Sequence, residues 1–297
     1  MKSIDYLDRQ TGELRREIVP GEGWLRWLYH HPMGKTVLHA AVKRRLLSAV
    51  YGRKMDTPAS RHRIPGFVAS LGIDMSEAAR PAGDYTSFND FFIRELKPGA
   101  RPVDTDPAAI ISPADGKILA FEDIRHLDSF FVKGRAFCLP DFLKNDALAR
   151  QYADGALLII RLAPVDYHRF HFPADGRISR SVPIDGHYFS VSPYAVKNRL
   201  SIYWENKREY SMLQTKTAGR ILLCEVGATM VGTIIQSYAP GADVRKGEEK
   251  GWFKFGGSTV ILLLEKGRAC IDADIIKNTK KGYETRVRMG ERVAAVI

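Results

Sequence analysis

The chain has little of what would place it outside the cell or across a membrane. Its 297 residues include only three cysteines, which are dispersed and form no CxxC pair, so we expect no disulfide framework. No apolar run approaches the roughly 18 residues of a membrane-spanning helix. No signal-peptide core follows the charged start of the chain. We therefore expect a reduced protein that faces the cytoplasm.

Acidic residues are missing from one long stretch. Residues 23–54 contain seven Lys and Arg but no Asp or Glu, in a chain whose net charge is +11. Apolar residues recur there at steps of three and four, which predicts an amphipathic helix. Basic residues beside Trp24 and Trp27 are typical of a helix in a lipid interface, where each Lys or Arg contributes about 1 kcal/mol. The basic window from Arg26 to Lys54 therefore indicates an anionic membrane surface as a partner.

Two other interpretations of this window stay open. A helix packed on its own domain with a solvated basic face is the more common arrangement of such a pattern. Nucleic acid is the other anionic partner, but no nucleic-acid recognition motif accompanies the charge, so we expect none.

The composition is that of a globular protein, with 45% hydrophobic and 27% charged residues. Residues 1–105 have a mostly helical pattern, and Ser87 begins a capping box that opens a helix running to Leu96. Residues 106–297 consist of short β-type runs separated by turn residues, such as 156–162 and 258–264. We predict an α+β protein with a helical, membrane-facing N-terminal region. A β-rich catalytic domain follows it, mainly antiparallel and sandwich-like or barrel-like.

Three segments contain residues that suit chemistry. Asp115 lies in Ser112-Pro113-Ala114-Asp115-Gly116, which is also ordinary turn chemistry. His168 and His171 follow an apolar run and precede a turn, but no third ligand makes them a convincing metal site. Ser258 follows two glycines, which free the backbone and leave the Gly257 carbonyl open to attack, or simply form a β-bulge. Val260 rules out the G-x-S-x-G motif of α/β-hydrolases.

Together these segments supply Asp, His and Ser in that order. A histidine oriented by a carboxylate and placed beside a hydroxyl is the recurring way to activate serine. On this pattern alone, the chain is a candidate Ser-His-Asp hydrolase acting on a lipid ester. A basic membrane-binding or RNA-binding module without catalysis is a further reading.

The ordered set of motifs resembles the phosphatidylserine decarboxylase proenzyme family. The resemblance runs from about residue 85 to the end of the chain, and the set is far more specific than any one motif. Many bacterial members have Leu-Gly-Ser-Thr at the last motif, where this chain has the Gly-Gly-Ser-Thr form. The matching stretches are Phe88-Asn89-Asp90-Phe91-Phe92, Lys97-Pro98-Gly99-Ala100-Arg101-Pro102, Ser112 to Gly116, Tyr167-His168-Arg169-Phe170-His171, Val226 to Gly232, and Phe255-Gly256-Gly257-Ser258-Thr259.

The resemblance implies that the chain is a precursor that cleaves itself between Gly257 and Ser258. Asp115 would orient His171, which would take the proton of Ser258 for attack on the Gly257 carbonyl. The resulting ester would break by β-elimination, leaving a β chain of residues 1–257 and an α chain of residues 258–297. The α chain would begin with a pyruvoyl group made from Ser258.

The resemblance also implies the reaction. The pyruvoyl group would form a Schiff base with phosphatidylserine and accept the electrons left by CO₂, so that phosphatidylethanolamine is released. His168 would handle the proton at the carbanion, or else hold the substrate or shape the pocket. The family further implies a homodimer, and with the basic window it implies a peripheral position on the cytoplasmic face of the cell membrane. No metal is expected.

Overall fold

The computed structural model describes most of the chain. The described residues are 4–17, 19, 23, 27–29, 31, 33–34, 45–125, 127, 131, 137–197, 199–229, 233–254 and 256–297, with the backbone alone at 45–49. Part of the basic window lies outside them, including Arg26, Lys35, Lys43 and Arg44, as do Met230 to Gly232 and Phe255 of the motifs.

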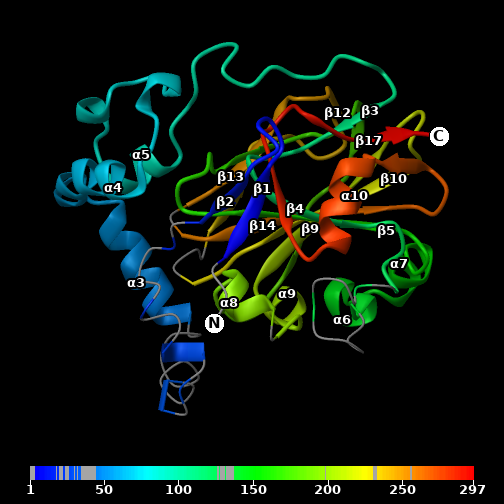
Figure 1. Ribbon diagram of the computed structural model, residues 1–297, viewed down its shortest axis with the longest axis horizontal. Helices are drawn as coiled ribbons and strands as arrows, with labels where there is room; N and C mark the ends of the chain where they lie inside the picture. The colour runs from blue at the N-terminus through cyan, green and yellow to red at the C-terminus, as the bar shows by residue number, and fades with distance from the viewer. Residues whose placement is uncertain are drawn as a thin grey trace.

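One large sheet forms the centre of the molecule, and its strands β1, β4, β14 and β9 are labelled in the middle of Figure 1. Its central strands β14 and β5 are fully buried and apolar except for Arg161, Ser258 and Thr259, as expected for strands covered on both faces. In spatial order its strands are β12 (Asp243–Val244), β7 (Gly176–Ile178), β9 (Arg208–Gln214), β10 (Arg220–Val226), β14 (Ser258–Leu264), β5 (Ala156–Leu162), β4 (Gly116–Phe121), β16 (Glu284–Val287), β1 (Asp5–Asp8) and β2 (Leu14–Arg16), with β8 (Val182–Ile184) paired to β9.

The pairing confirms the predicted α+β class and the mainly antiparallel sheet. Among the named strands the only parallel pair is β1 with β16. The barrel-like alternative is wrong for the part that the structure describes, because the large sheet runs from β12 to β2 without the two edge strands pairing.

Two small sheets and one helix cover one face of the large sheet. They enclose a core formed by residues such as Phe170, Phe253, Ile275 and Val293 with the even-numbered residues of β14. These elements are β11 (Ile234–Gln236), β13 (Glu249–Phe253) and β6 (Arg169–His171) in one sheet, β15 (Ala269–Ile271), β17 (Arg292–Val296) and β3 (Ala109–Ile111) in the other, and the helix α10 (Ala273–Lys280).

Short helices cover the opposite face. Phe142, Ala149 and Tyr203 from these helices pack on the odd-numbered residues of β14, such as Ile261. The helices are α6 (Leu139–Leu143), α7 (Asp146–Gln151), α8 (Pro193–Val196) and α9 (Ile202–Glu205). The large sheet therefore lies between two separate hydrophobic cores.

The remaining helices form a third cluster beside the sheet, at the left of Figure 1. Its own small core contains Met55, Ile64, Tyr85, Phe88 and Phe91. The elements are α3 (Arg45–Met55), the 3₁₀ helix η2 (Pro58–Arg63), α4 (Ile64–Leu71), the 3₁₀ turns η3 (Met75–Glu77) and η4 (Ala82–Asp84), and α5 (Phe88–Phe92).

The N-terminal region differs from the prediction of a mostly helical segment. Residues 5–8 and 14–16 are the strands β1 and β2, and β1 joins the large sheet beside β16. The α5 helix begins at the predicted cap, because the Ser87 hydroxyl accepts a hydrogen bond from the Asp90 amide. It ends at Phe92 and not Leu96, because the backbone of residues 95–97 bonds to residues 77–79 instead.

Candidate active site

Ser258 is the first residue of β14, and it is completely buried. It pairs with Leu162 of β5, and its side chain points to the same face as Val260 and Leu262, because side chains alternate along a strand. The Ser258 hydroxyl has no hydrogen-bond partner in the part of the chain that the structure describes. Buried hydroxyls are normally paired, so an unpaired one marks a candidate functional atom.

The two glycines before Ser258 differ in what they require. Gly256 has a φ of 128°, a conformation that side chains disfavour, so glycine is needed there. Gly257, in contrast, could be replaced by a residue with a side chain. An added Cβ would meet only Val191 Cγ2, at an ordinary contact distance of 3.5 Å. Neither backbone strain nor packing requires a glycine at 257. An unhindered carbonyl before Ser258 is a chemical reason for one.

His168 lies in the loop before β6 and is completely buried. Its Nδ1 donates to the Asp166 carbonyl at 2.8 Å, so Nε2 is the ring nitrogen with a free lone pair. Nε2 has no hydrogen-bond partner among the described residues. Burial lowers the pKa of His168 to about 4, although Asp166 and the nearby Gly256 backbone oppose the shift. His168 is therefore a neutral base with an open nitrogen, near the backbone two residues before Ser258.

His171, at the end of β6, has both ring nitrogens engaged. Nδ1 donates to the Gly247 carbonyl at 3.0 Å, and Nε2 lies 3.3 Å from the Tyr167 hydroxyl. Burial lowers the pKa of His171, so its ring is neutral as well. Its environment differs from that of His168 mainly in that Tyr167 occupies the nitrogen that would accept a proton.

The Asp115 carboxylate is held by other partners than a histidine. Arg101 donates to it from Nε at 2.8 Å and from Nη2 at 2.6 Å, and the Met289 amide donates at 2.8 Å. The backbone connects it to the histidine, because the His171 amide donates to the Pro113 carbonyl at 2.7 Å. The loop carrying Asp115 is thus fixed against β6.

The structure brings the predicted residues to one region without joining them in a hydrogen-bonded triad. Asp115 and His171 lie on adjoining backbone segments, but each side chain has other partners. Ser258 and His168 both keep an open polar atom. Assignment of Asp115, His171, Ser258 and His168 to their separate roles remains a prediction.

Sequence reasoning missed two buried cations next to His168. Arg94 follows α5 and donates from Nη2 to the Val165 carbonyl at 3.1 Å. Lys117 on β4 forms an ion pair with Asp166 at 3.0 Å, and the Asp166 carboxylate also accepts from the Ala163 amide. The two bonds of the Asp166 carboxylate fix the loop that presents His168. The one signal for Arg94 in the sequence is its position beside the aromatic run Phe91-Phe92.

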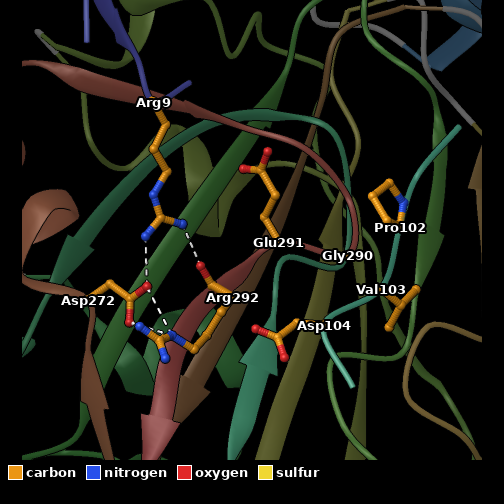
Figure 2. Close-up of a pocket in the computed structure, with 8 residues that line it drawn as sticks. All are labelled: Arg9, Pro102, Val103, Asp104, Asp272, Gly290, Glu291 and Arg292. Atoms are coloured by element: carbon orange, nitrogen blue, oxygen red, sulfur yellow. Dashed lines mark hydrogen bonds and ion pairs between the residues drawn. The ribbon is translucent and has the colours of Figure 1, made fainter. Parts of the chain in front are cut away.

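A pocket of about 420 Å³ is lined by the segments 102–104 and 290–292, which follow the Asp115 partners Arg101 and Met289 in the chain. It contains none of the predicted residues. Figure 2 shows Arg9 and Arg292 both pointing to Asp272, so these three charges of its wall are already paired. The Asp104 amide donates to the Gly290 carbonyl at 2.9 Å there, which holds together the two segments that bind Asp115. Within the described residues no cluster of three His, Cys, Asp or Glu side chains could hold a metal.

Comparison with known proteins places these residues in a family. A family profile described as phosphatidylserine decarboxylase matches residues 88–295. The chain is 54% identical over 291 residues to a protein named phosphatidylserine decarboxylase proenzyme from Fusobacterium nucleatum, covering 98% of this chain and 97% of that one. It is 47% identical to one from Desulfitobacterium hafniense strain Y51, with the same coverage, and 44% identical to one from Clostridium botulinum strain Alaska E43, over 99% of each. The chain belongs to the phosphatidylserine decarboxylase family.

Proposed function

We propose that this protein decarboxylates phosphatidylserine to phosphatidylethanolamine after cleaving its own chain between Gly257 and Ser258. The relatives' names support the substrate and the precursor form. The observation that carries the proposal is the buried, unpaired Ser258 hydroxyl directly after a glycine that packing does not require. The Ser-His-Asp hydrolase reading loses support, because no relative named here is a hydrolase.

In the cleavage step, the Ser258 oxygen attacks the Gly257 carbonyl carbon and the bond from that carbon to the Ser258 nitrogen breaks. The serine proton leaves its oxygen, and the amine nitrogen is protonated, so the peptide becomes an ester. Loss of the Ser258 α-proton then breaks the Cβ–O bond and releases a chain ending in the Gly257 carboxylate. Hydrolysis of the remaining unsaturated residue gives the pyruvoyl group and ammonia.

We assign the base for this step to His171, oriented by Asp115, and the later proton transfer to His168. For His171 this requires the Tyr167 hydroxyl to leave Nε2 and Asp115 to turn toward the ring. For His168 no bond has to break, since its Nε2 is already open. The two histidines therefore compete for the first role, and experiment distinguishes them.

The pyruvoyl group suits this site, because it is made from residue 258, where a buried polar atom has no partner. A pyruvoyl carbonyl supplies an electron sink for the pair left by departing CO₂. The protein's part is to exclude water and to hold a proton donor. His168 lies in a fully buried position, so it can return a proton without exchange with bulk solvent.

Intact-mass measurement of the purified protein tests the proposal. We expect two chains, 1–257 and 258–297, with a pyruvoyl mass at residue 258, and CO₂ release from phosphatidylserine. Ser258→Ala, His171→Ala and Asp115→Ala should each give one uncleaved chain. His168→Ala should cleave but not decarboxylate. An uncleaved wild-type chain that a serine-directed phosphonate labels at Ser258 would overturn the proposal in favour of the hydrolase.

We also propose that the protein binds peripherally to the cytoplasmic face of the membrane. Arg53, Lys54, Arg61 and Arg63 are exposed along α3 and η2, and Val50 is 56% exposed on the same helix. Part of the basic window instead packs on the domain, since Leu28 is buried in the core. No helix within the described residues is long and apolar enough to cross a bilayer.

The family resemblance also leads us to propose a homodimer. Light scattering of the purified, cleaved protein tests this directly. A mass of one α chain plus one β chain would show a monomer and contradict the proposal.

A further inference from the structure

Arg94 is a buried cation with an open donor. The residue is 5% exposed, and its guanidinium lies 5.2 Å from the centre of the Phe91 ring. Nη2 donates to the Val165 carbonyl, but Nη1 has no partner among the described residues. Burial lowers the pKa of Arg94, yet an arginine keeps its charge in proteins. The result is a desolvated positive charge with hydrogen-bonding capacity left over.

The other buried arginines do not share this feature. Arg161 uses Nε and both terminal nitrogens to bind Glu17 and Glu284. Arg208 donates from its three nitrogens to the carbonyls of Phe142, Asn206 and Asp141. Because both are fully paired, the open nitrogen of Arg94 is not a general property of buried arginines in this fold.

No carboxylate within the described residues forms an ion pair with Arg94. The carboxylates that influence it most are those of Asp115 and Asp166, and each is already bound to another cation. A buried charge that also keeps an unsatisfied donor is costly, so the open Nη1 of Arg94 indicates that an anion completes the site.

The open nitrogen of Arg94 borders the loop that holds His168. Arg94 donates to the Val165 carbonyl, and His168 donates to the carbonyl of the next residue, Asp166. The charge of Arg94 acts on His168, and the Gly256 backbone lies beside the same ring. An anion bound by Arg94 therefore lies at the edge of the region that contains Ser258.

We infer that Arg94 binds the phosphodiester group of the substrate. This inference rests on the proposed decarboxylation of phosphatidylserine, whose headgroup carries two anions. During decarboxylation the negative charge moves off the carboxylate, so a guanidinium on that group would stabilise the ground state more than the transition state. The phosphodiester keeps its charge throughout the reaction. Arg94 on the phosphodiester therefore strengthens binding without slowing the chemical step.

Steady-state kinetics on the cleaved enzyme test the inference, with phosphatidylserine in neutral detergent micelles. Arg94→Met should raise KM about 10- to 100-fold, as expected for a lost hydrogen bond to a charged group, and leave kcat nearly unchanged. Glycerophosphoethanolamine, which has the phosphodiester but no carboxylate, should lose inhibitory strength by a similar factor. Arg94→Lys should give a smaller effect, because it keeps the charge but not the planar fork.

Arg80→Met is the matched control, because Arg80 is an exposed arginine near α5 that pairs with Asp90. It should leave KM and the inhibition constant unchanged. An unchanged KM in Arg94→Met overturns the inference, as does a loss of kcat with unchanged inhibition by glycerophosphoethanolamine. Failed cleavage or a lower melting temperature in both Arg94 variants would assign a structural role and also overturn it. If the wild-type chain itself releases no CO₂, the proposed function fails, which is a separate result.

Discussion

Arg101 donates to both carboxylate oxygens of Asp115, at distances of 2.8 Å to Oδ1 and 2.6 Å to Oδ2. The pair is largely buried, with 9% of each side chain exposed, and Arg101 also binds Glu77 at 2.9 Å. Arg101 thus connects the helical cluster to the loop that carries a predicted catalytic carboxylate. Its contribution can be measured through stability and through cleavage.

Arg101→Met should destabilise the protein by about 3 kcal/mol, because it leaves Asp115 buried without its cation. It should also slow self-cleavage, since Asp115 loses the partner that positions it. Urea unfolding of the uncleaved Ser258→Ala chain measures the first effect. Arg80→Met is the control, because its pair with Asp90 is exposed and should contribute less than about 1 kcal/mol. Equal effects of the two substitutions would contradict the role of Arg101.

The depressed pKa of His168 predicts a loss of stability in acid. Its pKa is about 4 in the folded protein against 6.5 for a free histidine, so between these values the unfolded chain binds more protons. The free energy of unfolding is therefore unaffected by His168 above pH 6.5. It decreases as the pH falls from 6.5 toward 4, by up to about 3 kcal/mol. Urea unfolding of the Ser258→Ala chain at several pH values should show this slope. His168→Gln in the same background should reduce it, and an unchanged slope would refute the origin in His168.

Membrane binding should depend on the exposed basic residues of η2. Arg61→Gln with Arg63→Gln should weaken binding to vesicles containing phosphatidylserine by about 30-fold, at about 1 kcal/mol per charge. Salt should weaken the wild-type interaction too, because exposed charges are screened. The control is Arg177→Gln with Lys216→Gln, which removes the same charge from exposed positions in β7 and in the turn between β9 and β10. Equal losses in both double variants would show that only net charge matters.

The buried pair of Lys250 and Glu225 predicts strong coupling between two strands. Their charged atoms are 2.9 Å apart with neither side chain exposed, and Gln236 bonds to both. Lys250→Met should cost about 3–5 kcal/mol, because Glu225 remains buried and unpaired. Adding Glu225→Gln should restore part of this loss. A double-mutant cycle by urea unfolding checks the coupling, and additive effects would contradict it.

The sequence predicts the central strands well and the chain ends poorly. The predicted runs 156–162 and 258–264 coincide with β5 and β14, because strands covered on both faces are largely apolar. In contrast, β1 is stabilised by pairing with β16, which lies at the other end of the chain. Nothing local in residues 5–8 indicates that partner, so the sequence does not predict the two strands that precede the helices.

The same limit applies to the site. Motif order identifies Asp115, His168, His171 and Ser258, but their hydrogen-bond partners come from distant segments. The bond from His171 to the Gly247 carbonyl and the open Nη1 of Arg94 depend on how loops meet after folding. Residue types can therefore be predicted from the sequence, whereas which polar atoms are left open cannot.

The position of Ser258 at the start of β14 bears on whether folding precedes the proposed cleavage. Residues 258–297 supply β14 between β10 and β5, and also β16 between β4 and β1. If the proposed cleavage occurs, residues 1–257 alone would lack β14 and β16 from inside the large sheet, so we expect the precursor to fold before it is cut. After the proposed cut, the two chains would still share backbone hydrogen bonds along both edges of β14, so we expect them to stay together until the sheet unfolds. On this proposal, the peptide bond between Gly257 and Ser258 is needed for folding but not for holding the two chains together afterwards.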